Sequence, residues 1–321
     1  MRVAAIDIGT NTVLLLVAEV ASGIVRPLYQ EQRFGRLGQG VDASGRLQPE
    51  AVERVVAIVR RYLEVARTWG VERIGAVATS AVREARNREL LLGPLGEFGL
   101  GVRVLSGQEE AYWTYMGVRS GFPEFEELAV LDIGGGSAEF TWGRGLEVRF
   151  RISLPLGCVR LTERYLSAYP VDRAHLRALE QAVEAAWGAV SLPGPLPVLV
   201  GVAGTVTSLA ALELGLSEYA PERVERFWIA RERVLAWIER LCSLDGPDEI
   251  LALGPRILAG RADVWLAGLV ILAGLLRRLD APGLYASDRG LRYGWALYLA
   301  GNLSGEAAVG GSGLDRESRA R

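Results

Sequence analysis

The chain has 321 residues, of which 50% are hydrophobic and 23% are charged, and its formal net charge at pH 7 is −2. This length favours two domains over one, and the near-neutral charge gives no indication of a general nucleic-acid surface, so no nucleic-acid partner is expected. All 36 basic residues apart from the histidine are arginine, which suits phosphate recognition, although base composition or heat adaptation explains the bias as a whole better.

The cysteines, the histidine and the apolar tracts argue against a metal-binding, histidine-dependent or membrane-spanning protein. Cys158 and Cys242 lack the spacing of a metal site, which fits a reducing cytoplasm. The one histidine, His175, lies in a polar helical stretch and is expected at the surface, which excludes serine–histidine catalysis. The first residues resemble neither a signal peptide nor a transit peptide and predict a strand. The apolar tract at 265–276 is too short to cross a bilayer and predicts a buried helix. We therefore expect a cytoplasmic protein without a membrane partner.

The first 121 residues predict a β-hairpin followed by alternating strands and helices. The hairpin strands are expected at 3–7 and 12–20, and a third strand at 23–33. Then follow a helix at 48–69, a strand at 73–79, a helix at 80–98, a strand at 102–106 and a helix at 107–122.

The second half repeats this pattern. It predicts strands at 129–133, 138–142 and 146–154, a helix at 172–190, a strand at 198–204 and a helix from 205, with further helices to the end. We expect domains at 1–121 and 122–301, with the last helix, about 288–301, as a candidate to pack back on the first domain. Residues 302–321 are small and polar, and predict a disordered tail.

The two hairpins resemble each other in sequence. Residues 3–18 read VAAIDIGTNTVLLLVA, and residues 129–143 read AVLDIGGGSAEFTWG. Two such turns, facing each other across a cleft, can hold a phosphate chain from both sides. The duplication therefore predicts an α/β protein with two RNase H-like domains around a central cleft, the actin-like fold shared by sugar kinases and Hsp70-type chaperones.

The first turn offers a phosphate several donors. Gly9, Thr10 and Asn11 present backbone N–H groups, and Thr12 adds a hydroxyl group. The alternative is an ordinary hairpin turn in which Asp7 caps the backbone.

The second turn is the stronger candidate. Gly134, Gly135, Gly136 and Ser137 give three consecutive glycines, more than a hairpin turn needs, which indicates a ligand against the backbone. Asp132 and Glu139 flank the turn, and two carboxylates would repel phosphate unless Mg²⁺ bridged them. The alternative is a glycine turn with two solvated acids.

Glu109 and Glu110 lie in the first turn of the helix that begins after Ser106. Acids there stabilise a helix, but one of the two could instead be the general base that activates water. Adjacent helical residues point about 100° apart, so only one should face the cleft. Their spacing does not decide which.

Two further segments follow strands and could bind phosphate. Arg83 lies in the first turns after the strand at 73–79, whereas Arg33 and Arg36 are weaker candidates. Gly204 and Thr205 open a helix, whose N-terminus favours an anion.

Eight segments in order resemble the exopolyphosphatase / guanosine pentaphosphate phosphohydrolase family (Ppx/GppA). They are AAIDIGTNTVLLLVAE, RLGQGVDASGRL, VATSAVREARN, VLSGQEEA, VLDIGGGSAEF, SLPLGCVRLTERY, GVAGTVTSLAAL and SDRGLRYG. The resemblance implies that Glu110 is catalytic, that Asp132 and Glu139 bind Mg²⁺ or Mn²⁺, and that both turns and Arg83 bind phosphate. It also implies the short two-domain form of the family, and leaves a homodimer open.

The resemblance implies removal of terminal phosphate from inorganic polyphosphate, or of the 5′-γ-phosphate from guanosine pentaphosphate, by attack of water on a phosphoanhydride. The alternatives are an ATP-dependent small-molecule kinase of the same fold and a non-catalytic sensor of polyphosphate or alarmone. A kinase needs an acceptor pocket and a sensor needs no base, so acceptor-dependent ATP use or binding without turnover would distinguish them.

Overall fold

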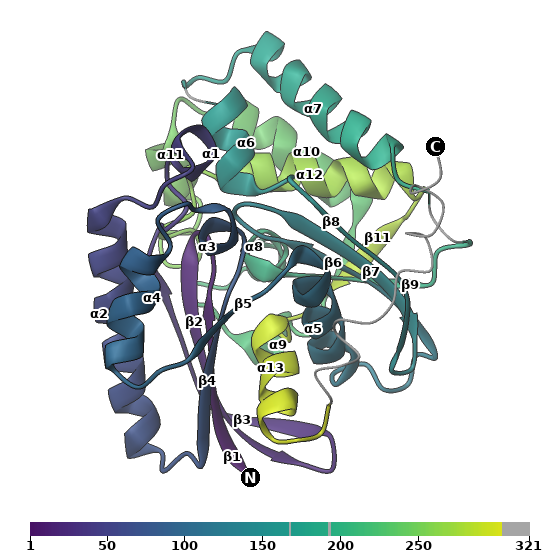
Figure 1. Cartoon of the computed structure of the whole chain (residues 1–321). Coiled ribbons are helices and arrows are strands. Elements are labelled where there is room, and N and C mark those ends of the chain that lie inside the picture. The colour runs from purple at the N-terminus through teal and green to yellow at the C-terminus, as the bar shows by residue number, and fades with distance from the viewer. Residues whose placement is uncertain (167, 192–193, 304–321) are drawn as a thin grey trace, which may run out of the picture.

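Two β-sheets, one from each half of the chain, organise the computed structural model, which describes residues 1–166, 168–191 and 194–303 (Figure 1). The first half contains β1 (Arg2–Ile8), β2 (Thr12–Ala21), β3 (Ile24–Phe34), α1 (Val41–Ser44), α2 (Pro49–Thr68), β4 (Arg73–Ala78), α3 (Ser80–Glu84), α4 (Glu89–Glu97), β5 (Val102–Val104) and α5 (Gly107–Arg119). The second half contains β6 (Glu127–Ile133), β7 (Ala138–Arg144), β8 (Glu147–Leu154), α6 (Cys158–Tyr165), α7 (Arg173–Gly188), β9 (Val198–Val202), α8 (Ala203–Glu213), α9 (Pro221–Val224), β10 (Trp228–Ala230), α10 (Arg231–Cys242), α11 (Pro247–Ala252), α12 (Trp265–Arg278), β11 (Gly283–Ala286) and α13 (Leu291–Leu299).

The two sheets share one strand order. Sheet A runs β3-β2-β1-β4-β5, and sheet B runs β8-β7-β6-β9-β11 with β10 added at its edge. In both, the first three strands form an antiparallel meander and the next two run parallel to the first strand. The prediction of two RNase H-like domains of the actin-like fold is therefore confirmed.

Alternate residues of the central strands pack into different cores, because successive side chains in a strand point to opposite faces. In β1, Ala4 and Ile6 pack with α2, whereas Val3 and Ala5 join a core between the two sheets. Leu128 and Val130 of β6 enter this middle core from the other side. The middle core is completed by α5 and α13, so these two helices form a layer shared by both halves (Figure 1).

In the shared layer, each helix packs on the sheet of the half of the chain to which it does not belong. Helix α5 comes from the first half but packs on β6, β7 and β8, whereas α13 comes from the second half and packs on β1, β2 and β4. For this reason the domain boundary at residue 121 stays a prediction.

Several local features depart from the sequence-based expectations. The single helix expected at 80–98 is two helices, because Arg86 N–H bonds to Gly45 O at 3.0 Å and Asn87 binds the backbone of Leu47 through both its amide atoms. Helices α1 and α6 and the short strands β10 and β11 were missed. The last helix begins at Leu291 rather than 288, and the strand expected at 198–204 ends at Val202.

Other expectations are met. Every residue of the apolar tract 265–276 is buried in α12, and His175 is exposed on α7. No helix in the described part of the chain is both long and apolar enough to span a membrane. Nearly all of the predicted disordered tail lies outside the described residues.

Helices α5 and α13 meet backbone to backbone. A Cβ atom on Gly294 would overlap the carbonyl group of Trp113, and one on Gly117 would overlap the carbonyl oxygen of Gly290. Both glycines are buried within the shared layer. Any side chain at either position must separate the two helices.

We predict that Gly294→Ala lowers the free energy of unfolding by about 2 kcal/mol or more, because the added methyl group forces the backbones apart. Chemical denaturation measures this. The control is Gly96→Ala in α4, where an added Cβ would meet nothing within 4 Å among the described residues. That variant should be neutral or stabilised by up to about 1 kcal/mol, and equal effects of the two substitutions would contradict the close crossing.

Candidate active site

An aspartate stands near the carboxyl end of the first strand of each sheet. Asp7 in β1 and Asp132 in β6 follow the residues that enter the middle core, so both side chains lie on the faces turned toward the other half. The two turns that follow have one geometry: Gly9 N–H donates to Thr12 O at 2.9 Å, and Gly134 N–H donates to Ser137 O at 3.0 Å. The sequence repeat is therefore a structural repeat.

The two turns approach each other closely. A Cβ atom on Gly135 would lie 2.9 Å from Cβ of Thr10, and one on Gly136 would overlap the hydroxyl group of Ser80. Glycine at 135 and 136 therefore allows the second turn to approach the first turn and α3 directly.

A cavity of about 400 Å³ lies between the halves. Most of the predicted phosphate-binding and acidic residues line it: Gly9, Thr10, Asn11, Thr12, Glu110, Asp132, Gly134, Gly135, Gly136, Ser137, Gly204 and Thr205. The fold thus brings together residues from three loops and from α5 that are far apart in the sequence.

The structure separates the roles of Glu109 and Glu110. Glu109 forms a capping box, in which its carboxylate accepts from Ser106 N–H at 2.9 Å and its own N–H donates to Ser106 Oγ at 3.2 Å. It also pairs with Arg103 at 2.5 Å. Glu110 is 7% exposed and lines the cavity. Of the two candidates, only Glu110 is in a position to act on a ligand.

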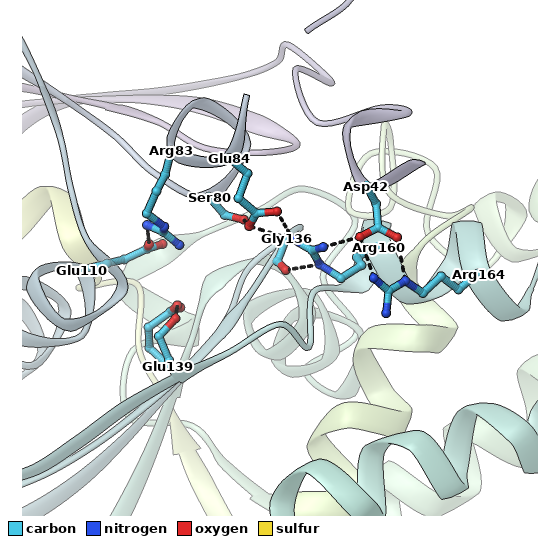
Figure 2. A network of polar contacts seen from close by, with 10 residues as sticks. Asp42, Ser80, Arg83, Glu84, Glu110, Gly136, Glu139, Arg160 and Arg164 are labelled. Carbon is cyan, nitrogen blue, oxygen red and sulfur yellow. Dashed lines mark hydrogen bonds and ion pairs between the residues drawn. The ribbon is translucent and has the colours of Figure 1, made fainter. Parts of the chain in front are cut away.

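Arg83 and Glu139 are not among the cavity-lining residues, but both lie near Glu110 (Figure 2). Nη1 of Arg83 donates to Leu105 O at 2.8 Å and to Oε2 of Glu110 at 3.0 Å. The guanidinium group therefore holds the Glu110 carboxylate, and its binding of phosphate stays a prediction. Neither Arg33, which pairs with Glu31, nor Arg36 is in the cavity lining.

Glu139 is the cross-strand partner of Asp132 and is 1% exposed. Ser153 Oγ donates to its Oε1 at 2.6 Å, whereas Oε2 has no hydrogen-bond partner among the described residues. At the matching place in the first hairpin, Leu14 faces Asp7. The second hairpin alone therefore brings two carboxylates side by side.

The four acids of the site, Asp7, Glu110, Asp132 and Glu139, all have raised pKa values because they are buried. Burial, reinforced by Glu110 and Asp132, raises the pKa of Asp7 to about 8, against the opposing effect of Arg292. Burial raises the pKa of Glu110 to about 7, although Arg83 opposes it, and raises that of Asp132 to about 6. Burial, then Glu110 and Asp132, raise the pKa of Glu139 well above its usual value. The raised pKa values mean that burial and mutual repulsion disfavour ionisation of these acids unless a positive charge lies beside them.

These residues fit a hard divalent cation that is shared with phosphate oxygens. Asp7 Oδ1 and Glu139 Oε2 are buried and lack hydrogen-bond partners within the described residues. However, no three His, Cys, Asp or Glu side chains in that part of the chain are grouped closely enough to hold an ion by themselves. Mg²⁺ is commonly bound by one or two carboxylates, with phosphate and water completing its shell.

The sequence analysis assigned no role in ligand binding to several charged residues that line the cavity, among them Asp7, Arg261 and Arg292. Asp7 could have been found, because the repeat pairs it with Asp132. Arg261 and Arg292 carry no such signal: they are 8% and 9% exposed, and each has a buried Nε without a hydrogen-bond partner among the described residues. Both put guanidinium groups beside the cavity.

The arginines are held by their surroundings. Arg261 Nη1 donates to Gly204 O and to Ser208 Oγ, both at 2.9 Å, and the guanidinium group lies over the ring of Phe34. Arg292 Nη2 donates to Gln30 Oε1 at 2.6 Å and pairs with Asp288 at 2.5 Å.

The chain is similar over most of its length to proteins of known name. The pattern of the Ppx/GppA phosphatase family matches residues 16–302. Mycobacterium tuberculosis exopolyphosphatase 2 is 34% identical, with 94% of this chain and 99% of that protein covered. Exopolyphosphatase 1 of the same species is 29% identical, with 100% and 94% covered. A solved structure of the Aquifex aeolicus Ppx/GppA family member is 33% identical, covers 95% of this chain and 99% of its own, and has a TM-score of 0.80.

We predict that Glu139→Gln raises the midpoint of thermal unfolding at pH 8 without divalent cations. The folded protein keeps a proton on Glu139 that the unfolded chain releases near pH 4.5. This contribution to stability is therefore complete below pH 4.5 and is lost as the pH rises through the folded pKa. Because glutamine does not titrate, the variant should lose less stability than the wild type between pH 5 and pH 8.

Glu109→Gln is the control with the opposite sign. Burial would raise the pKa of Glu109, but the bonds from Ser106 and Arg103 outweigh it and lower that pKa. Its stabilisation is present above pH 4.5 and lost in acid, so the glutamine variant should be less stable than the wild type at pH 8. Glu139→Gln falling below the wild type at pH 8 would contradict the buried acid cluster.

Proposed function

The chain belongs to the Ppx/GppA phosphatase family, and on that premise we propose that it removes the terminal phosphate of inorganic polyphosphate or the 5′-γ-phosphate of guanosine pentaphosphate. The reaction is attack of water on a phosphoanhydride. One observation carries the proposal: a buried carboxylate, Glu110, lies in the cavity between two phosphate-binding turns and is held by Arg83 at 3.0 Å.

Glu110 is the general base that takes a proton from the attacking water. A base works best with a pKa near the working pH, and burial raises the pKa of Glu110 to about 7. Arg83 opposes that rise and orients the carboxylate. This pairing keeps an ionised fraction of Glu110 available at neutral pH.

The backbone turns bind the phosphoryl groups on both sides of the cavity. Gly9 N–H and Gly134 N–H bond within their own turns, and this fixes the N–H groups of Thr10, Asn11, Gly135 and Gly136 before the substrate arrives. Those groups stabilise the charge of the transition state without reorganising. Gly204 and Thr205, at the start of α8, and the guanidinium group of Arg261 bind phosphates farther along the chain. The leaving phosphate chain or nucleotide departs from this side.

Asp132 and Glu139 are the residues that would hold Mg²⁺ or Mn²⁺ together with phosphate oxygens, and Asp7 would add negative charge beside them. The ion supplies positive charge that lets buried carboxylates and phosphates occupy one site. The carboxylate oxygens without hydrogen-bond partners support this assignment.

We predict that Glu110→Gln lowers kcat for phosphate release about 10²–10⁴-fold, because glutamine cannot accept the proton. Phosphate release from medium-chain polyphosphate and from guanosine pentaphosphate measures it. The matched control is Glu109→Gln on the same helical turn, which should keep kcat within about threefold, since its carboxylate caps the helix. Unchanged turnover in Glu110→Gln would remove it as the base.

A comparison of kcat/KM for polyphosphate and guanosine pentaphosphate decides between the two substrates. We expect the wild type to release phosphate from at least one of them without a second acceptor. Turnover of ATP only with an added acceptor would instead support a kinase, and binding of polyphosphate with Mg²⁺ but no turnover would support a sensor.

A further inference from the structure

Each phosphate-binding turn is covered by the segment that follows the third strand of its sheet. After β3, the N–H groups of Arg36 and Gly38 donate to Asn11 O at 2.9 Å and to Thr10 O at 2.8 Å. After β8, the N–H groups of Cys158 and Val159 donate to Gly134 O at 3.0 Å and to Gly135 O at 2.9 Å. The two covering segments therefore occupy equivalent places in the two halves.

Each covering segment sends one arginine to the other half of the chain. Arg160 in α6 is 8% exposed, and its Nε donates to Gly136 O at 2.7 Å (Figure 2). Its Nη2 donates to both oxygens of Glu84 in α3 at 2.7 Å, and its Nη1 pairs with Asp42 in α1. One guanidinium group therefore joins the second turn to two helices of the first half.

Helix α3, which Arg160 contacts through Glu84, also carries Arg83, the residue that holds the proposed general base Glu110. Ser80 donates to Glu84 at 2.6 Å, and Arg83, one residue before Glu84, holds Glu110. The position of α3 against Arg160 therefore governs both the wall of the second turn and the orientation of Glu110.

Arg36 forms the reciprocal bridge. Its Nη1 and Nη2 lie 2.7 Å and 3.2 Å from the two carboxylate oxygens of Asp263, in the turn that precedes α12. Asn11 of the first turn supports it, since its Nδ2 donates to Gly260 O at 3.2 Å. Arg36 has φ of 47°, a left-handed conformation that is costly for a non-glycine residue. The strain indicates that the segment is shaped to present this side chain.

We propose that Arg36 and Arg160 are positioning residues that couple closure of the two halves to the geometry of the phosphate-binding turns. This rests on the proposed function insofar as the ligand is phosphate. Each arginine touches a turn, or the segment bonded to it, and a carboxylate of the other half. Opening the cavity must therefore break both bridges, and closing it sets both turns and Glu110 together.

The distance between the halves tests the proposal without relying on catalysis. Spin labels at Glu64→Cys on α2 and Glu184→Cys on α7, both exposed positions, report the separation in a Cys242→Ser background, since Cys158 is buried. The probe ligand is sodium tripolyphosphate with Mg²⁺, and its affinity is measured by calorimetry.

We predict that Arg36→Asp and Asp263→Arg each shift the label distances toward longer values and weaken tripolyphosphate binding about tenfold. The double variant, which restores an ion pair of opposite polarity, should recover the wild-type distances and an affinity within about threefold. Arg233→Asp is the matched control, because Arg233 pairs with Glu213 at 2.7 Å and 2.9 Å within the second half. It should change neither quantity.

A second pair of variants tests Arg160. Arg160→Lys keeps the charge but cannot reach three acceptors at once, so it should open the halves as much as Arg160→Gln does. Unchanged label distances in the Arg36 and Asp263 single variants would overturn the proposal, and so would opening without any loss of tripolyphosphate affinity. A wild type that binds tripolyphosphate and closes but releases no phosphate would instead contradict the proposed hydrolase function alone.

Discussion

The contact between α5 and α13 at Gly117 and Gly294 is the constraint on which the rest of the structure depends. These helices are the layer between the two sheets, and each packs on the sheet of the other half. Glu110 stands at the start of α5 and Arg292 at the start of α13, so one backbone crossing positions a carboxylate and a guanidinium group at the same cavity. A bulkier pair of residues would widen this layer and separate Glu110 and Arg292 from the turns.

Next to that layer, four acidic side chains are buried close together, an arrangement that lowers the stability of the fold when they ionise. Burial raises the pKa of Asp7, Glu110, Asp132 and Glu139, so each of them destabilises the fold when ionised. The two glycine-containing turns add mostly neutral N–H donors rather than cations. The arrangement is suited to a ligand that brings both phosphate and a divalent ion, which satisfies the acids and the donors together.

The two hairpins share a backbone but differ chemically. Asp7 faces Leu14 across the first hairpin, whereas Asp132 faces Glu139 across the second. The shared topology thus gives two turns of the same geometry, and a single residue difference between the two hairpins, Glu139 in place of Leu14, gives the second carboxylate. The bridges of Arg36 and Arg160 show the same relation, since equivalent segments reach across the cavity in opposite directions.

The sequence by itself determined the duplicated fold, the buried helix α12 and the glycine-containing turns of the cavity with Asp132, because hydrophobic period, glycine turns and strand-end acids are local signals. It could not choose between Glu109 and Glu110, since both lie in the first turn of one helix; only packing against Arg103 and Arg83 separates them. It also missed Arg261, Arg292, the break between α3 and α4, and the short strands β10 and β11. Those features depend on partners distant in the chain, and only the tertiary structure brings such partners together.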